Sequence, residues 1–173
     1  MKKKKHLFLI GMFIPIFFIF LLVIVAGGTS SSADSFSSSA GSLNITSKDL
    51  ASKANISEEK AKNVIDIASY LMSKERFSIQ GASGALAVAE RESSFDPEAE
   101  NLGGGVAGIF QWSGWSNNVN GNRWSKAESR TLSMDVELKL MSTELNSAYK
   151  KTKDLVSVST DPRQASLDWS QYY

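Results

Sequence analysis

Apolar residues form one uninterrupted block near the start of the chain. Residues 7–26 carry no charge, and 18 of these 20 are Ala, Val, Ile, Leu, Met or Phe. A helix of about 20 residues, rising 1.5 Å per residue, spans the roughly 30 Å hydrocarbon core of a bilayer. The block predicts a transmembrane helix, with the lysines at 2–5 on the cytoplasmic side and the rest of the chain extracellular. A signal peptide cleaved near residues 26–33 is the alternative, which would give a secreted protein.

Serine dominates the segment that follows, residues 29–43. Such a polar stretch buries too little apolar surface to offset the entropy of ordering, so it is expected to form a flexible linker. The chain therefore divides into a membrane anchor at 1–28, a linker at 29–43 and one folded domain at 44–173. About 130 residues are enough for a single hydrophobic core.

Within the folded domain, apolar positions follow the i, i+3, i+4 spacing of amphipathic helices. The pattern predicts a helix from 57 to about 74 and a second from 78 to about 94, which ends before Asp96-Pro97. A third helix covers 134–148. A fourth opens at Asp161-Pro162, where proline suits the first turn.

The segments between these helices give fewer signals. Short helices are expected near 47–53 and 123–130, and residues 106–112 are the best candidate for a strand or an extended loop. Alternating patterns typical of strands are otherwise scarce. The predicted fold class is mainly α.

Composition limits the chemistry open to the folded domain. The chain has no cysteine, and its single histidine, His6, lies next to the N-terminal lysines. This excludes disulfides, Ser-His-Asp and Cys-His constellations, and His or Cys zinc sites there. We therefore expect no metal and no cofactor. Past Gly28, 15 basic residues stand against 18 acidic ones, a net charge of −3, which excludes a basic nucleic-acid-binding domain.

Two adjacent segments carry the candidate chemistry. The helix predicted at 78–94 ends in Glu90-Arg91-Glu92-Ser93, which places two carboxylates at the rim of an apolar helix. The glycine-rich segment 103–115 follows, and glycines allow sharp turns and close approach to a ligand. In it, Trp112 and Trp115 offer flat faces suited to sugar rings. A phosphate-binding loop is the alternative for the glycines, but the P-loop pattern of Lys followed by Ser or Thr is absent.

The combination of the two segments is more specific than either one. Taken separately, the acidic helix end fits a solvated surface, the glycines a surface loop and the tryptophans a core. Together, Glu92-Ser93-Ser94-Phe95-Asp96-Pro97 and Gly105-Val106-Ala107-Gly108-Ile109-Phe110-Gln111 resemble the Glu-Ser and Gly-x-x-Gly-Leu-Met-Gln segments of the lysozyme-like superfamily, which includes goose-type lysozymes and lytic transglycosylases. The run Gln111-Trp112-Ser113-Gly114, with Arg123 downstream, is most similar to the phage tail-tip lysozyme branch.

The resemblance covers about residues 57–173 and implies a lysozyme-like helical domain with a small loop or β segment. It implies that peptidoglycan glycan strands are the partner and that Glu92 is the catalytic acid. The implied substrate-binding residues are Ser93, Gly108, Gln111, Trp112, Trp115 and Arg123. The Ala-Tyr-Asn-Ala-Gly motif of typical lytic transglycosylases is absent, which favours hydrolysis over the formation of 1,6-anhydro ends. Residues 168–173 are similar to the family's closing helix stopped short, so the natural chain is expected to continue.

Glycosidic cleavage also suits the residues that are present. Peptidoglycan amidases and endopeptidases generally need zinc with histidines, or a Cys-His pair. Carboxylates alone can protonate a leaving glycosidic oxygen, and an apolar setting keeps such an acid protonated near neutral pH. Candidates for a second carboxylate are Asp96, Glu98 and Glu100. Glu90 points about 200° away from Glu92 around the helix, and we interpret it as a surface or supporting residue.

The sequence is compatible with two further classes of function. One is an inactive module that binds the cell wall and keeps its site as a lectin would. The other is a membrane-anchored scaffold of a secretion, conjugation or phage-related machine.

Overall fold

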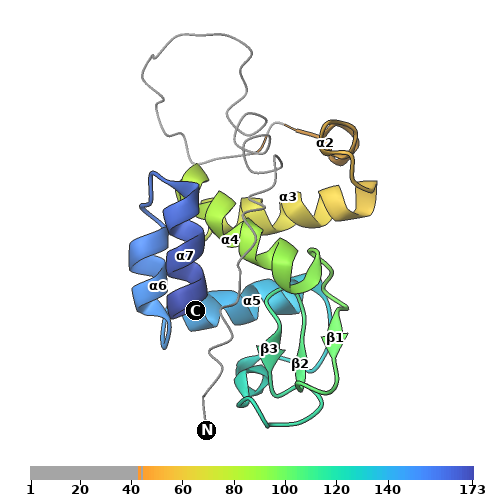
Figure 1. Cartoon of the computed structure of the whole chain (residues 1–173), viewed down its shortest axis with the longest axis vertical. Helices are drawn as coiled ribbons and strands as arrows, with labels where there is room; N and C mark the ends of the chain where they lie inside the picture. Colours follow the sequence, from red (N-terminus) through yellow and green to blue (C-terminus); the bar gives the residue numbers. More distant parts are fainter. Residues whose placement is uncertain (1–42, 44) are drawn as a thin grey trace, which may run out of the picture.

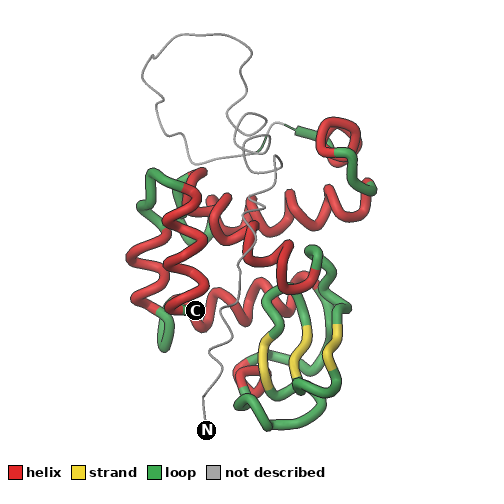
Figure 2. The backbone as a smooth tube through the Cα atoms, in the orientation of Figure 1, coloured by secondary structure: helices red, strands yellow, loops and turns green. Residues whose placement is uncertain are grey.

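A computed structural model describes residue 43 and residues 45–173 (Figures 1 and 2). The expected anchor at 1–28 and nearly all of the expected linker at 29–43 lie outside the described residues. None of the helices in the described part has the length and apolar character needed to cross a bilayer.

Helices make up most of the described chain, which confirms the mainly α prediction. The described residues form six α-helices: α2 (Ser47–Ala54), α3 (Glu58–Ser73), α4 (Ile79–Ser93), α5 (Met134–Leu145), α6 (Lys150–Val156) and α7 (Pro162–Tyr172). A 3-10 helix, η1 (Arg123–Lys126), precedes α5. The short strands β1 (Glu100–Asn101), β2 (Val106–Ala107) and β3 (Trp112–Ser113) complete the fold.

Local capping signals set the starts of three helices. The hydroxyl oxygens of Ser57 and Ser78 accept the N–H groups of Lys60 and Gly81, at 3.1 and 2.9 Å, and so begin α3 and α4. Asp161 caps α7 immediately before the proline of its first turn. Such a cap stabilises a helix by about 1 kcal/mol. The predicted boundaries of α3 and α4 are therefore confirmed to within one residue.

Three expectations are corrected in detail. The helix expected over 134–148 ends at Leu145, and α6 follows as a separate helix that the pattern did not predict, because only Thr152 and Val156 of its residues are buried. The helix expected at 123–130 is the shorter η1. The strand expected at 106–112 is divided into β2 and β3, because Gly108 and Gln111 adopt left-handed φ angles of 86° and 50° and reverse the chain.

The central helix α4 packs very closely against α6 and α7. A Cβ atom placed on Gly84 would lie 2.4 Å from the Cβ of Ala165 in α7, and one on Gly81 would lie 2.1 Å from the carbonyl oxygen of Val156 in α6. Only glycine fits at either position. The small residues of this segment therefore serve close helix packing.

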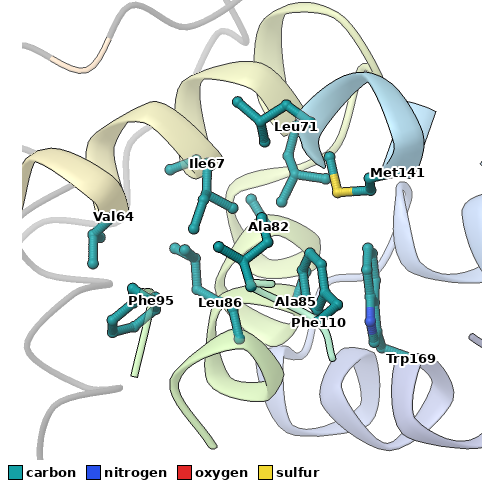
Figure 3. Packing of buried hydrophobic residues seen from close by; sticks show 14 of the residues in the cluster. Val64, Ile67, Leu71, Ala82, Ala85, Leu86, Phe95, Phe110, Met141 and Trp169 are labelled. Atoms are coloured by element: carbon teal, nitrogen blue, oxygen red, sulfur yellow. The ribbon is translucent and has the colours of Figure 1, made fainter. Parts of the chain in front are cut away.

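The hydrophobic core fills the space between α3, α4, α5 and α7. Figure 3 shows apolar side chains from these helices converging around α4, together with two aromatic rings from the segments that follow it. The labelled members are Val64, Ile67, Leu71, Ala82, Ala85, Leu86, Phe95, Phe110, Met141 and Trp169. This core holds α4 from several sides and so determines where its C-terminal end lies.

The three strands form one small antiparallel sheet in the order β1-β2-β3. Glu100 pairs with Ala107, and Val106 pairs with Ser113. The sheet lies to one side of the helical body, beyond the C-terminal end of α4 (Figure 1). The glycine-rich segment that the sequence singled out is thereby placed next to the last turn of α4.

Candidate active site

Glu92 lies in the last turn of α4, and its side chain is exposed. Among the described residues, none forms a hydrogen bond or ion pair with its carboxylate. The helix ends at once, because Ser94 and Phe95 both adopt left-handed φ angles, of 59° and 66°. Two successive non-glycine residues in this region are uncommon and cost free energy, and the fully buried ring of Phe95 holds the turn in place. The end of α4 therefore presents Glu92 to solvent in a defined position.

Ser93 joins the end of α4 to the turn between β2 and β3. Its hydroxyl oxygen lies 3.1 Å from the carbonyl oxygen of Ala89, within the helix, and 3.1 Å from that of Ile109, in the turn. The hydroxyl proton is thus shared between two backbone acceptors. Ser93, expected to bind substrate, here connects the two halves of the site.

Gln111 and Gly108 hold the turn itself. The N–H of Gly108 donates to the carbonyl oxygen of Ala99 at 2.9 Å, and the N–H of Gln111 donates to that of Gly108 at 3.0 Å. The Gln111 side-chain amide donates to the carbonyl oxygens of Ala99 and Gly108, at 3.1 and 3.0 Å. Both residues, expected to bind substrate, fix the conformation of the backbone in this structure.

Glu137 of α5 lies behind the same turn, and sequence reasoning missed it. Its side chain is fully buried, and its carboxyl oxygen Oε2 accepts the N–H of Ile109 at 2.7 Å. Burial raises the pKa of Glu137 from the ordinary value of 4.5 to about 8, against the opposing effect of that hydrogen bond, and the negative charge of Asp96 adds to the increase. A signal was present: Glu137, Met141 and Glu144 follow the i, i+4, i+7 spacing of a buried helix face.

Trp112 lies in the core and presents no surface to a ligand. Its ring is 0 % exposed, and its indole N–H lies 3.0 Å from Oε2 of Glu144 and 2.9 Å from the hydroxyl of Tyr173. The expectation that Trp112 stacks on a sugar is therefore not met in this structure. The interpretation of the tryptophans as core residues holds for Trp112.

Arg123 is likewise engaged inside the domain. Its Nη2 and Nε atoms lie 2.5 and 3.0 Å from the two carboxylate oxygens of Glu144, and its guanidinium lies 4.5 and 4.4 Å from the ring centres of Tyr149 and Tyr173. Such a two-pronged, stacked arrangement is characteristic of structural arginine pairs. The expected role of Arg123 in substrate binding is not supported by this geometry.

Glu144 accepts hydrogen bonds from Trp112, Arg123 and Lys126. Burial alone would raise the pKa of Glu144, but the hydrogen bonds and charge of Arg123, together with Lys126 at 3.1 Å, hold it below its ordinary value. The carboxylate is therefore charged and compensated.

Trp115 keeps part of its surface accessible. Its ring packs on that of Trp124 at a centroid distance of 4.9 Å, and the guanidinium of Arg130 lies 5.0 Å from its centre. Of the two tryptophans that were expected to contact sugars, Trp115 is the one that retains a partly exposed ring.

Glu90 and Glu92 leave α4 on different sides. Glu90 is half-buried, and burial raises its pKa, while the positive charge of Lys60 in α3 acts in the opposite direction. Glu92 follows Gly81 by eleven residues, close to three full turns, so it shares the side on which Gly81 faces α6. An apolar setting was expected for the acid. Glu90 is the half-buried one of the two, whereas Glu92 is exposed and accessible to a large substrate.

The other acids near the site are exposed. Asp96 accepts the N–H of Glu98 at 2.8 Å, and Glu98 and Glu100 both face solvent. Within residues 45–173, no group of three or more His, Asp or Glu side chains is placed to hold a metal ion.

Fold and site together define a lysozyme-like domain: a central helix that ends in an accessible glutamate, fastened by the next serine to a glycine turn of a small sheet. The model of the phage tail lysozyme family matches residues 62–173, and the chain belongs to this family. No curated protein and no solved structure shows a significant match. The family membership confirms the resemblance seen in the sequence and suggests a lysozyme-like, peptidoglycan-lytic function.

Proposed function

We propose that this protein is a membrane-anchored muramidase that cleaves peptidoglycan glycan strands outside the cell, with Glu92 as the general acid. The observation that carries the proposal is the hydrogen bond from the Ser93 hydroxyl to the carbonyl oxygen of Ile109, at 3.1 Å. It holds the last turn of α4 against the glycine turn, while the Glu92 carboxyl group stays exposed. Membership of the phage tail lysozyme family supports peptidoglycan as the substrate.

The exposure of Glu92 is compatible with acid catalysis on a polymer. A general acid must reach the glycosidic oxygen that it protonates, so its side chain must be accessible before the strand binds. A bound glycan strand would displace water from the carboxyl group, and loss of water favours the neutral form of a carboxylic acid. The positive charge that develops on the sugar is then matched by the carboxylate left after proton transfer.

The support for membrane anchoring comes from the sequence alone. The uncharged block at 7–26, preceded by the lysines at 2–5, supports a single membrane-spanning helix with the domain outside. The serine-rich segment would then act as a tether that lets the domain reach the wall near the membrane.

Transglycosylation is a second candidate, because the superfamily contains enzymes of both kinds. In that reaction a hydroxyl group of the substrate attacks in place of water and leaves a 1,6-anhydro sugar. The absence of the Ala-Tyr-Asn-Ala-Gly motif favours hydrolysis. An inactive wall-binding or scaffold module is a third candidate, and the presence of an exposed Glu92 argues against it.

Mass spectrometry of the products from purified peptidoglycan separates these candidates. The full-length chain, kept soluble with a mild detergent, should release shortened glycans that end in reducing sugars. Glu92→Gln keeps size and hydrogen bonding but cannot donate the proton, so it should lose turnover by about 100-fold or more while still binding the wall.

Two variants serve as controls in the same assay. Glu59→Gln removes an exposed acid of α3 and should leave the rate unchanged. Glu90→Gln should stay within several-fold of the wild-type rate. An active Glu92→Gln protein, or products cut only in the peptide stems, would refute the proposal. Products ending in 1,6-anhydro sugars would reassign it to transglycosylation.

A further inference from the structure

Glu137 is a buried acid that the proposed reaction does not use. It stands in the core-facing part of α5, and its side chain is fully buried. Its carboxyl has one partner among the described residues, the N–H of Ile109, while Oε1 has none. A buried carboxylate with a single neutral donor is costly, because the charge is neither solvated nor paired. An acid is therefore an unfavourable choice at this position for stability alone.

The turn between β2 and β3 is shaped around this carboxyl group. Gly108 has a φ angle of 86°, and a Cβ atom at that position would lie 2.6 Å from Oε2 and 2.7 Å from the carboxyl carbon of Glu137. The carboxyl group thus occupies the space that any other residue at 108 would fill. The next residue, Ile109, is itself fully buried and donates its N–H at 2.7 Å. Backbone and carboxyl fit each other closely on two counts.

The same peptide segment also connects to the end of α4. While the N–H of Ile109 donates to Glu137, its carbonyl oxygen lies 3.1 Å from the hydroxyl of Ser93. Ser93 follows Glu92 directly in the last turn of α4. Two hydrogen bonds thus connect α5, through the single residue Ile109 of the turn, to the residue next to the proposed acid.

Within the part of the chain that the structure describes, no cation pairs with Glu137. Asp96, after α4, is the charged residue that acts on it, and its negative charge disfavours ionisation. The cations of η1, Arg123 and Lys126, pair with Glu144 instead. Lys153 of α6 pairs with Glu75 at 2.7 Å. The surroundings of Glu137 therefore favour the neutral acid.

We propose that Glu137 is a positioning residue for the glycan cleavage: its buried carboxyl group holds the turn at Gly108 and Ile109 against the end of α4, and so determines the position of Glu92. This inference rests on the proposed function. Ionisation would put an uncompensated negative charge in the core, and the turn would have to shift to let water reach it. Glu92 would then still be present, but it would no longer be correctly positioned relative to the turn.

Two substitutions test the role in the full-length chain. Glu137→Gln keeps the acceptor for the N–H of Ile109 and cannot ionise. Glu137→Leu has similar volume and leaves that N–H buried without an acceptor. Asp135→Asn removes an exposed acid of the same helix, paired with Lys139, and serves as the control. Rates of glycan release are measured from pH 5.5 to 9.5, per folded molecule.

The expected results separate positioning from stability. Glu137→Gln should match the wild-type rate within several-fold at pH 6, and the ratio of its rate to that of the wild type should rise as the pH passes about 8. Titration of the general acid is common to both proteins and cancels in this ratio. Glu137→Leu should lower kcat by about ten- to a hundred-fold with little change in KM, because small misplacements are costly in catalysis. Asp135→Asn should follow the wild type throughout.

A flat ratio across this pH range would overturn the inference, as would a Glu137→Leu protein with the wild-type kcat. If Glu137→Leu does not fold, the ratio for Glu137→Gln decides alone. An independent readout is the backbone amide signals of Ile109 and Glu92 by NMR. Both should titrate with one midpoint in the wild type and not in Glu137→Gln, whether or not the chain cleaves glycans. Titration of Ile109 without Glu92 would refute the positioning role while leaving the proposed function untouched.

Discussion

Each end of α5 buries a glutamate, but the surroundings of the two carboxyl groups shift their pKa values in opposite directions. Glu137 and Glu144 lie two turns apart on one helix, and both side chains are fully buried. Glu144 receives Arg123, Lys126 and the indole of Trp112, and its pKa is held below the ordinary value. Glu137 receives one backbone N–H, and burial raises its pKa to about 8. Burial alone thus does not decide the charge of an acid; the groups that reach it do.

The two ends of α5 therefore have different structural roles. The Glu144 end ties η1 and the end of the described chain to the core through charged hydrogen bonds, which are strong and directional. The Glu137 end faces the turn of the candidate active site and contributes a neutral group.

The largest effect is expected at the charged end. Arg123→Ala removes the two-pronged partner of Glu144 and leaves a buried carboxylate with only Lys126 and neutral donors. Breaking a buried pair in this way costs about 3–5 kcal/mol. Urea denaturation of wild type and variant should show this loss in the free energy of unfolding. A change below about 1 kcal/mol would mean that the ion pair adds little to stability.

The next effect concerns the neutral end and its dependence on pH. The pKa of Glu137 is 4.5 before folding and about 8 after it, so its stabilising contribution is complete below pH 4.5 and is lost as the pH rises to about 8. One group of this kind changes the free energy of unfolding by about 1.4 kcal/mol per pH unit in that range. Glu137→Gln should therefore gain on the wild type as the pH rises, in denaturant titrations at pH 5, 6, 7 and 8. A constant difference would show that Glu137 is already charged.

Glu144 should give a smaller effect of opposite sign. Its folded pKa is lowered, so its contribution is present above the ordinary value of 4.5 and is lost as the pH falls through the folded value. Glu144→Gln should therefore flatten the acid side of the stability profile and leave the slope between pH 5 and 8 unchanged. Acid titrations followed by circular dichroism would measure this. If both variants altered the same pH range, the contrast between the two ends of α5 would be refuted.

The smallest effect is expected at Glu90, whose surroundings combine the burial of Glu137 with the nearby cation of Glu144. It is half-buried, burial raises its pKa, and the charge of Lys60 acts against that increase. Lys60→Met should move the pKa of Glu90 further up, as followed by NMR of its side chain. The rate of wall lysis should change by no more than several-fold, because we interpret Glu90 as a supporting residue. An unchanged pKa would show that Lys60 does not act on Glu90.

Local signals explain what the sequence predicted well. Ser57, Ser78 and Asp161 cap helices through bonds to residues two or three positions away, so their effect can be read without the fold. The Glu92-Ser93 segment and the glycine turn were also recognisable as motifs. Their juxtaposition through Ser93 and Ile109 follows from the chain reversal after α4.

Contacts between distant residues explain what it could not predict. Trp112 was expected to bind substrate, with a core position as the alternative, and the sequence could not decide between them because its partners, Glu144 and Tyr173, come 32 and 61 residues later. The partner of Glu137 lies 28 residues earlier, in a turn whose shape is fixed only by the assembled sheet. An aromatic or acidic residue looks the same in the sequence whether its partner is solvent or the core, and only the fold distinguishes them.

The two glycines that face α6 and α7 restrict how α4 can rotate about its axis. At Gly84 the backbone of α4 approaches Ala165 so closely that even a methyl group would overlap it. Turning the helix by one residue would bring Ser83 or Ala85 to this contact, and both carry the Cβ atom for which there is no space. The helix therefore has one rotational setting, established near its N-terminal end. This rotational setting fixes the direction of every side chain farther along the helix. A substitution at Gly84 would therefore change the direction in which Glu92 points, although the two residues lie more than about ten ångströms apart by helix rise.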